Sequence, residues 1–289
     1  MRARAASWPA FYARRRAVWI PAQAPPGPGR GPERLESRPE LTGTPLPSHR
    51  IAIPTFLAVL AGLFALEFAV LAISPVSRET WLLENTLSVA AVAALALTYR
   101  RFRFSRISYA LMFTFLSFHV FGAHYTYSLV PYDAFTQRWL GFSLDAALGF
   151  ERNMFDRWVH FAYGLLLAYP IREIFLRIAD VRGFWGYFLP LDLTMSTSMI
   201  YELIEWGAAV LFGGDLGTAY LGTQGDEWDA HKDMALASLG AVITMAVTLA
   251  INRGLGRDVA AEWAASFRVV HPEPLGEEAI ARELNQREP

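Results

Sequence analysis

The chain of 289 residues is 53% hydrophobic and 18% charged, with a formal net charge of −1 and a mean hydropathy of +0.24. A soluble domain of this length carries more charge and less apolar mass, so the composition favours an integral membrane protein. The absence of cysteine excludes disulfides, thiolate metal ligands and a cysteine nucleophile. Lys232 is the only lysine among 26 basic residues, which we interpret as a codon-composition effect and not as a binding signal.

Residues 1–50 have the composition of a disordered tail. They contain nine of the 17 prolines and nine arginines. Pro-Gly runs such as 25–29 do not pack a core. The apolar stretch 17–20, which follows three arginines, is too short for the apolar region of a signal peptide. The sequence therefore predicts an Arg/Pro-rich tail, with a mis-assigned start codon as the alternative.

From residue 51 the chain is a series of long apolar segments. Each is long enough to cross a hydrocarbon core of about 30 Å at a rise of about 1.5 Å per residue. The fifth segment contains Pro190, which predicts a kink or a re-entrant start. We expect an all-α fold with about six transmembrane helices over 51–253. The predicted spans are roughly 51–73, 81–99, 107–129, 158–176, 186–212 and 233–252.

The remaining tail, residues 254–289, is charged, and we expect it to lie in solvent with an amphipathic helix around 277–284. The orientation follows from the arginines, which are concentrated in the N-terminal tail and in three segments. All of them fall on one side of the membrane if there are six spans, and such loops face the cytoplasm. Both termini are therefore predicted to be cytoplasmic. The three segments are 100–106, 172–182 and 253–257.

Carboxylates and imidazoles from distant segments fall at one depth, on the extracytoplasmic side of this topology. Glu202 and Glu205 are three residues apart and share one helical face. Two glutamates at this spacing do not both stay ionised in hydrocarbon without an arginine partner, a shared proton or a metal ion. This pair is the feature that a purely structural role explains least well.

Two further groups have the spacing of one helical face. The first is Arg152, Asp156 and His160, with steps of four residues. The second is Asp226, Asp229 and Asp233, with steps of three and four residues, provided that the sixth helix begins early. Of the two histidines near the end of the third span, His124 is favoured over His119 because Tyr127 lies three residues further on. Loop salt bridges, helix caps and interfacial aromatic belts are the alternative interpretations of these residues.

Together these residues favour a site with hard oxygen and nitrogen ligands for a divalent metal such as Zn²⁺, Mg²⁺ or Mn²⁺. One uncoordinated acid would activate water, and arginines would hold an anionic headgroup. The proposed catalytic residues, which are also the proposed metal ligands, are Glu202, Glu205, His124, His160, Asp226 and Asp229. The proposed substrate-binding residues are Arg152, Arg157, Tyr127 and Gln224.

Several uncommon motifs occur in order between residues 55 and 250. They are Trp81-Leu82-Leu83-Glu84-Asn85, Gly122-Ala123-His124-Tyr125-Thr126-Tyr127, Arg152-Asn153 with Asp156-Arg157 and His160-Phe161, Tyr201-Glu202 with Glu205-Trp206, and Gly222-Thr223-Gln224-Gly225-Asp226 with Trp228-Asp229 and Asp233-Met234. In these motifs the chain resembles the YjdF-like family of bacterial inner-membrane proteins, a family defined by a domain of unknown function. The resemblance implies an inner-membrane location and a multi-span helical fold, and it implies no activity. The long N-terminal tail departs from the family pattern.

Three functions remain open at this point. The first is an intramembrane, metal-dependent enzyme that acts on a lipid or envelope substrate. The second is a non-catalytic membrane component that binds a lipid or an envelope partner. The third is a proton- or ion-coupled transporter, against which the missing internal repeat and the few acids at the cytoplasmic ends argue. We expect the lipid bilayer as a partner and no nucleic acid.

Overall fold

The structure is a computed structural model, and it describes residues 53–214, 223–270 and 276–285. These residues form helices and, within the described ranges, no strand. The predicted tail 1–50 lies outside the described residues. The helices are α1 (Ile53–Leu71), α2 (Arg78–Thr98), α3 (Arg106–His124), α4 (Tyr132–Leu140), α5 (Leu144–Leu148), α6 (Phe155–Arg177), α7 (Trp185–Phe212), α9 (Asp229–Gly254), α10 (Val259–Ser266) and α11 (Glu277–Asn285).

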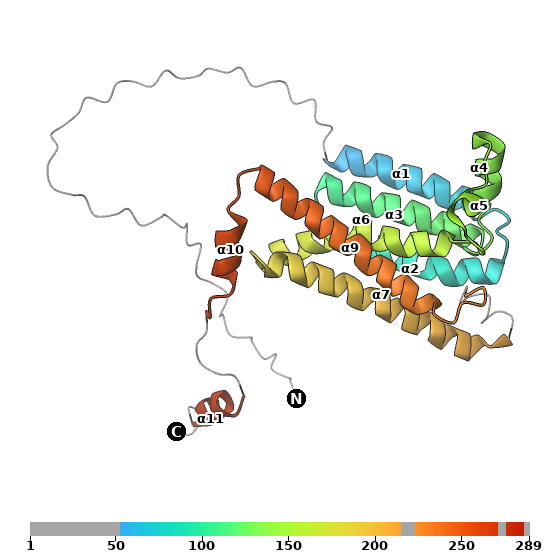
Figure 1. The fold of residues 1–289 in the computed structure, drawn as a ribbon. Coiled ribbons are helices and arrows are strands. Elements are labelled where there is room, and N and C mark those ends of the chain that lie inside the picture. The colour runs from blue at the N-terminus through green and yellow to red at the C-terminus, as the bar shows by residue number, and fades with distance from the viewer. Residues whose placement is uncertain (1–52, 215–222, 271–275, 286–289) are drawn as a thin grey trace, which may run out of the picture. The chain divides into compact units, whose positions relative to one another are not determined.

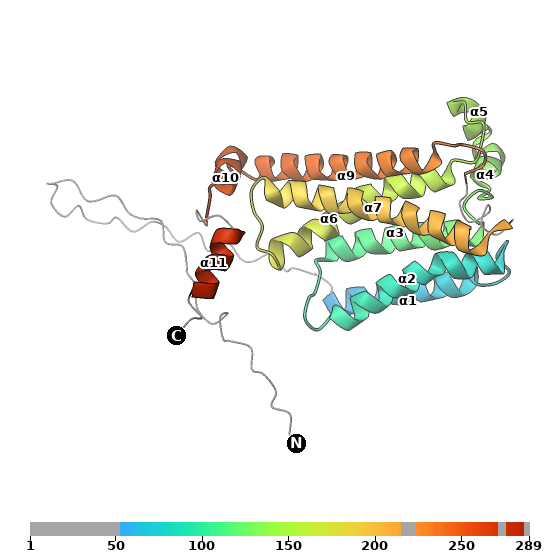
Figure 2. The ribbon, with the colours of Figure 1, turned by 90° about the horizontal axis from the view of Figure 1, so that it is seen from below.

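Six long helices, α1, α2, α3, α6, α7 and α9, run side by side as a bundle (Figures 1 and 2). Among the described residues, five of them are long and apolar enough to cross a membrane: α1, α2, α3, α6 and α9. The remaining one, α7, has 28 residues, contains Asp192, Glu202 and Glu205, and is not among these five. The prediction of an all-α membrane helix bundle is confirmed, and the six long helices correspond to the six predicted spans.

Helix starts follow local capping chemistry. The hydroxyl oxygen of Ser77 accepts a hydrogen bond from the Thr80 amide at 3.2 Å, and Ser105 accepts one from the Ser108 amide at the same distance. Such caps satisfy backbone donors that the first turn of a helix leaves free. Pro190 lies within α7, which is continuous from Trp185 to Phe212.

The third predicted span, 107–129, extends too far, because α3 ends at His124. Thr126 and Tyr127 both have a φ of 53°, a left-handed conformation that non-glycine residues adopt at a cost. The chain therefore turns back on α3 at this point. Short helices α4 and α5, which the hydropathy pattern did not predict, occupy the connection to α6.

Helices α6 and α9 approach each other closely because two glycines face the partner backbone. A Cβ atom on Gly164 would lie 1.8 Å from the Ala237 carbonyl oxygen, and one on Gly240 would lie 2.3 Å from the Phe161 carbonyl oxygen. Thr244 adds a 2.5 Å hydrogen bond to the Leu165 carbonyl. Small residues at helix interfaces are the usual means of close packing in membranes. This contact brings the first turns of α6 and α9 together.

Beyond α9 the chain packs back on the start of α7. The Ser266 hydroxyl accepts a hydrogen bond from the Phe184 amide at 3.2 Å, and the Trp263 ring lies edge-on to Phe184, with centroids 5.4 Å apart. Helix α10, which the hydropathy pattern did not predict, makes this contact. The amphipathic helix expected around 277–284 is α11.

The two ends of the bundle differ in chemistry. Helix α1 begins and α9 ends at one end (Figure 1). At the other end α6 and α9 begin, and their first turns contain Asp156 and Asp229. We call the latter the acidic end, because most of the carboxylates predicted to form the site lie there.

Candidate metal site and cavity

Three side chains at the acidic end are arranged as a metal site would be. One ligand atom from each of Asp156, His160 and Asp233 lies within 4.8 Å of the other two. Asp156 and His160 are one turn apart on α6, and Asp233 comes from α9. Their positions follow from the packing just described, since Gly164 is one turn beyond His160 and Ala237 one turn beyond Asp233.

Two carboxylate oxygens in this cluster have no hydrogen-bond partner among the described residues. They are Oδ1 of Asp233 and Oε1 of Glu202, and both atoms are buried. The residue Asp233 is only 2% exposed. Glu202 Oε1 lies 3.6 Å from His160 Nε2, and Asp156 Oδ1 lies 3.7 Å from the same nitrogen. A buried carboxylate oxygen without a donor is unfavourable, so this arrangement favours a bound cation or a proton.

The end of this cluster is covered by ion pairs, which we call the polar cap. Arg152 pairs with Asp229, and Arg157 pairs with both Asp226 and Asp229. Lys232 Nζ lies 2.7 Å from the Asp226 carboxylate. The hydrogen bond from Lys232, with further bonds from the Trp228 amide and Arg157, holds the pKa of Asp226 below its usual range. Asp226 therefore stays ionised at neutral pH.

Two further hydrogen bonds join the same loops. The backbone amide of Asn153 donates a hydrogen bond to the side-chain oxygen of Gln224 at 3.2 Å. The side-chain amide of Gln224 donates one to the backbone carbonyl of Asn153 at 3.0 Å. Arg152 also donates to the Thr223 carbonyl at 2.5 Å. The segment before α9 is thus attached to the segment before α6, and residues 152, 153, 157, 223, 224, 226, 229 and 232 complete the polar cap.

The connection between α3 and α6 positions the start of α6. The Tyr132 hydroxyl accepts a hydrogen bond from the Met154 amide at 2.9 Å and donates one to Asp145 at 2.7 Å. Burial, together with the bond to Asp145, raises the pKa of Tyr132 to about 12, so the hydroxyl remains a donor. Asp133 accepts from the Asp145 amide at 2.9 Å and from Ser143, which holds its pKa below the usual range.

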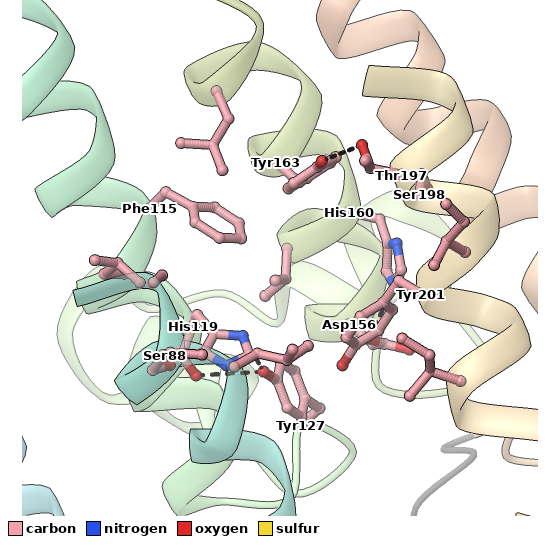
Figure 3. A pocket seen from close by; sticks show the side chains of 18 residues that line it. Ser88, Phe115, His119, Tyr127, Asp156, His160, Tyr163, Thr197, Ser198 and Tyr201 are labelled. Carbon is pink, nitrogen blue, oxygen red and sulfur yellow. Dashed lines mark hydrogen bonds and ion pairs between the residues drawn. The ribbon is translucent and has the colours of Figure 1, made fainter. Parts of the chain in front are cut away.

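A cavity of about 440 Å³ lies beside the cluster, between α2, α3, α6 and α7 (Figure 3). Most of its wall is apolar. Its polar groups come from both sides: Asp156, His160 and Tyr201 lie together on one side, and Ser88, His119 and Tyr127 lie on the other. Pockets of this kind, apolar with a few convergent polar groups, are typical of small-molecule sites.

Two hydrogen bonds at the cavity wall define the tautomer of the His119 ring. Its Nε2 lies 3.2 Å from the Glu84 carbonyl oxygen, and its Nδ1 lies 2.6 Å from the Tyr127 hydroxyl. A carbonyl only accepts, so Nε2 is the donor and Nδ1 accepts the proton of Tyr127. Glycine at position 122 makes room for the Tyr127 ring, since a Cβ there would lie 2.7 Å from it. The left-handed turn after α3 thus serves to place Tyr127.

The structure places His119, and not the favoured His124, at the wall of the cavity. His124 Nδ1 lies 2.7 Å from the Leu71 carbonyl oxygen, so this side chain joins the end of α3 to the end of α1. His119 lies five residues earlier and faces the cavity. The hydropathy pattern does not set the rotation of α3, and the hydrogen bond to Leu71 was not visible in it.

The predicted face of Arg152, Asp156 and His160 is only partly correct. Helix α6 begins at Phe155, so Arg152 lies in the preceding loop, while Asp156 and His160 do share a face. Similarly, α9 begins at Asp229, and Asp226 belongs to the turn before it. Both arginines proposed to bind substrate, Arg152 and Arg157, are paired with aspartates.

The remaining predicted site residues are divided between the cluster, the cavity and the polar cap. Glu202 lies beside His160, and Glu205 is buried among the acids Asp156, Glu84 and Glu202. Tyr127 lines the cavity. Gln224, Asp226 and Asp229 belong to the polar cap. The structure adds residues that the proposed site did not include, namely Asp156, Asp233, His119, Glu84, Tyr201, Ser88 and Ser198.

A signal for Asp156 and Asp233 was present in the sequence. Asp156 lies four residues before His160, and Asp233 lies four residues after Asp229. Each pair is separated by one turn of its helix. The pairing of the two turns across the α6–α9 contact could not be inferred, because the rotation of one helix against the other depends on packing.

The fold and the polar site define a multi-pass helical membrane protein. A family model described as "Predicted membrane protein (DUF2238)" matches residues 56–254, so the chain belongs to this family. The inner membrane protein YjdF of Escherichia coli (strain K12) is 39% identical over 174 residues, which are 60% of this chain and 79% of that protein. The expected family and the inner-membrane location are therefore confirmed. No solved structure matches the chain.

Proposed function

We propose that this protein is a metal-dependent membrane enzyme that hydrolyses a lipid or envelope substrate at Asp156, His160 and Asp233. The observation that supports it is the convergence of three ligand atoms within 4.8 Å of one another, from two helices. A buried oxygen of one of these ligands, Asp233 Oδ1, has no hydrogen-bond partner in the described chain. A divalent cation would satisfy that oxygen and offset the negative charge of the cluster.

The donor set suits hydrolysis. Catalytic zinc sites commonly have three protein ligands and leave a further position for water or substrate, and carboxylate-rich sites also suit Mg²⁺ and Mn²⁺. The bound ion would polarise a phosphoryl or carbonyl oxygen and lower the pKa of a water molecule. Arg152 and Arg157 pair with Asp229 and Asp226, whereas Asp156, His160 and Asp233 have ligand atoms within 4.8 Å of one another, so we assign these three as the ligands.

In this proposal Glu202 acts as the general base. Its Oε1 is buried, has no hydrogen-bond partner in the described chain, and lies 3.6 Å from His160 Nε2. In the proposed reaction the water oxygen forms a bond to the phosphorus or acyl carbon as its proton passes to Glu202. The ester bond to the leaving oxygen breaks, and that oxygen takes the proton from Glu202, so the base is regenerated.

The proposal includes the orientation of the protein. The start of α1 and the end of α9 lie at the same end of the bundle, as six passes require (Figure 1). Arginines are concentrated in the segments at that end, including Arg100, Arg101, Arg177 and Arg257. The positive-inside bias then places both termini in the cytoplasm and the acidic end on the extracytoplasmic side.

Metal content of the detergent-purified protein tests the proposal. We expect one equivalent of metal, measured by inductively coupled plasma mass spectrometry, in the parent and in the control Glu227→Gln. Glu227 is an exposed acid in the neighbouring loop. Asp156→Asn and Asp233→Asn should each lose the metal and remain folded. A metal-free parent that takes up none of Zn²⁺, Mg²⁺ or Mn²⁺ after chelation and dialysis would contradict the proposal.

Activity is tested with an extract of bacterial envelope lipids, with products followed by mass spectrometry. We expect hydrolysis by the parent and by Glu227→Gln. Glu202→Gln should keep its metal and lose turnover by about 10²–10⁴-fold, which is the range of general-base catalysis. Loss of metal in Glu202→Gln would assign Glu202 as a ligand and not as the base. If metal binds but no product forms from any extract, the non-catalytic lipid-binding alternative is favoured.

A further inference from the structure

The cavity beside the cluster is open between two helices. Helix α2 packs against α3, whereas α7 packs against α6 and α9. The cavity is lined from both α2 and α7. Leu87 on α2 is 42% exposed, and Ile200 and Ile204 on α7 are 48% and 47% exposed. These half-exposed side chains line the cavity and also reach the outer surface of the bundle, so the opening faces the hydrocarbon core of the bilayer.

One hydrogen bond joins the two sides of this opening. The Tyr201 hydroxyl on α7 donates to Oε2 of Glu84 on α2 at 3.2 Å. Glu84 is 3% exposed, so the bond lies at the inner edge of the opening. Deeper in the cavity, Ser88 and Ser198 have buried hydroxyl oxygens without a hydrogen-bond partner in the described chain. They line the same cavity as Asp156 and His160.

The polar cap closes the other approach. Arg152 and Arg157 each pair with aspartates from the α9 side, and Asn153 and Gln224 exchange two hydrogen bonds. Water-soluble substrates would have to break several of these contacts to reach Asp156 from that side. On the bilayer side the two helices are joined by the Tyr201–Glu84 hydrogen bond, and the cavity-lining residues at the surface are apolar and half-exposed.

We propose that the substrate is a membrane lipid that enters sideways between α2 and α7. Its hydrocarbon chain lies against Leu87, Ile200 and Ile204, and its polar group reaches Ser198, His160 and Asp156 (Figure 3). This rests on the proposed function for the chemistry of the site, and it selects the lipid over a soluble envelope substrate. The polar groups at the inner wall and the apolar groups at the opening match the two parts of a lipid.

Thiol labelling in proteoliposomes tests the route. The chain has no cysteine, so each single-cysteine variant contains one thiol. Ser88→Cys places it in the cavity, Leu97→Cys on the lipid-facing surface of α2, where the residue is 82% exposed, and Glu227→Cys in the exposed loop. The reagents are a lipid-soluble pyrene maleimide and a sulfonated maleimide that does not partition into the bilayer. Brominated phospholipids then quench any pyrene that contacts acyl chains.

We expect pyrene to label Ser88→Cys and to be quenched there as at Leu97→Cys, while the sulfonated reagent labels only Glu227→Cys. Equal labelling of Ser88→Cys and Glu227→Cys by the sulfonated reagent would show a water-filled cavity and overturn the proposal in favour of a soluble substrate. Labelling of Ser88→Cys by neither reagent would also overturn it.

Narrowing the opening provides the second arm. In the Ser88→Cys background, Ala91→Trp should slow pyrene labelling several-fold, whereas the neighbouring Val92→Trp, which does not line the cavity, should not. If Ala91→Trp fails to fold, Ile204→Trp with the control Leu203→Trp makes the same test from α7. Equal rates in the matched variants would contradict entry at this place. Labelling requires no metal, so this result and the metal analysis can fail separately.

Discussion

Two carboxylates on the same helix show how the ends of the bundle differ. Glu173, near the end of α6, accepts hydrogen bonds from the Ser105 amide at 3.0 Å, the Ser108 hydroxyl at 2.6 Å and Arg177 at 2.5 Å. Asp156, in the first turn of α6, has His160 Nε2 at 3.7 Å as its nearest ion-pair partner in the described chain. An acid whose donors are all supplied by the fold stabilises the fold, whereas an acid left without them is available to a ligand.

The charges around the two carboxylates follow the same division. Among the acids around Asp156, it is Asp226 and Asp229 that pair with the three cations of the polar cap, Arg152, Arg157 and Lys232. The acids that remain are Glu84, Asp156, Glu202, Glu205 and Asp233. A group of buried acids without arginine partners is unfavourable in a membrane unless a cation or protons accompany it, so function is the better explanation for it.

The largest effect is expected from the contact that brings the acidic cluster together. Gly164→Ala places a methyl group 1.8 Å from the Ala237 carbonyl oxygen, so α6 and α9 must separate. Overpacking of this kind costs about 1–3 kcal/mol, and here the obstacle is backbone. We expect a lower thermal unfolding temperature in detergent together with loss of metal. Gly62→Ala on α1, where a Cβ meets nothing within 4 Å, is the control and should match the parent. Metal retention in Gly164→Ala would separate the site from this contact.

The comparison of the two carboxylates is tested by matched substitutions. Glu173→Gln removes charge-assisted hydrogen bonds, each of which contributes about 1.5–3 kcal/mol, and should lower the unfolding temperature without altering metal content. Asp156→Asn should do the reverse, since it removes metal and relieves repulsion among unpaired acids, which keeps or raises the unfolding temperature of the metal-free protein. The unfolding temperatures of both variants are measured after chelation has removed the metal. A metal-free Asp156→Asn protein less stable than Glu173→Gln would contradict the assignment of a structural and a functional acid.

The smallest effect is expected at the exposed side of the polar cap. The pKa of Asp226 is lowered in the folded protein, foremost by the hydrogen bond from Lys232. Ionised Asp226 therefore stabilises the folded state fully above its ordinary pKa of about 3.9. That contribution is lost as the pH falls through the lower folded value. Amide exchange of residues 223–229, corrected for intrinsic rates, should therefore be constant between about pH 5 and 8.

Asp226→Asn should raise this exchange at all pH values, with little change in global stability. Lys232→Gln is the milder control, because an exposed ion pair contributes little to stability. A cap that opens between pH 5 and 8 in the parent would mean that another titrating group holds it.

The sequence by itself determined the fold class, the long apolar segments and the gathering of polar residues at one end. Length, hydropathy and the spacing of Glu202 from Glu205 are local properties, so they could be read directly. The tertiary structure decided which of these residues meet. His119 faces the cavity, whereas His124 contacts the Leu71 carbonyl oxygen. Asp156, His160 and Asp233 converge because the Gly164 and Gly240 contacts set the rotation and separation of α6 and α9. In a membrane most helix faces are apolar, so hydropathy does not select the inner face, and packing decides which faces meet.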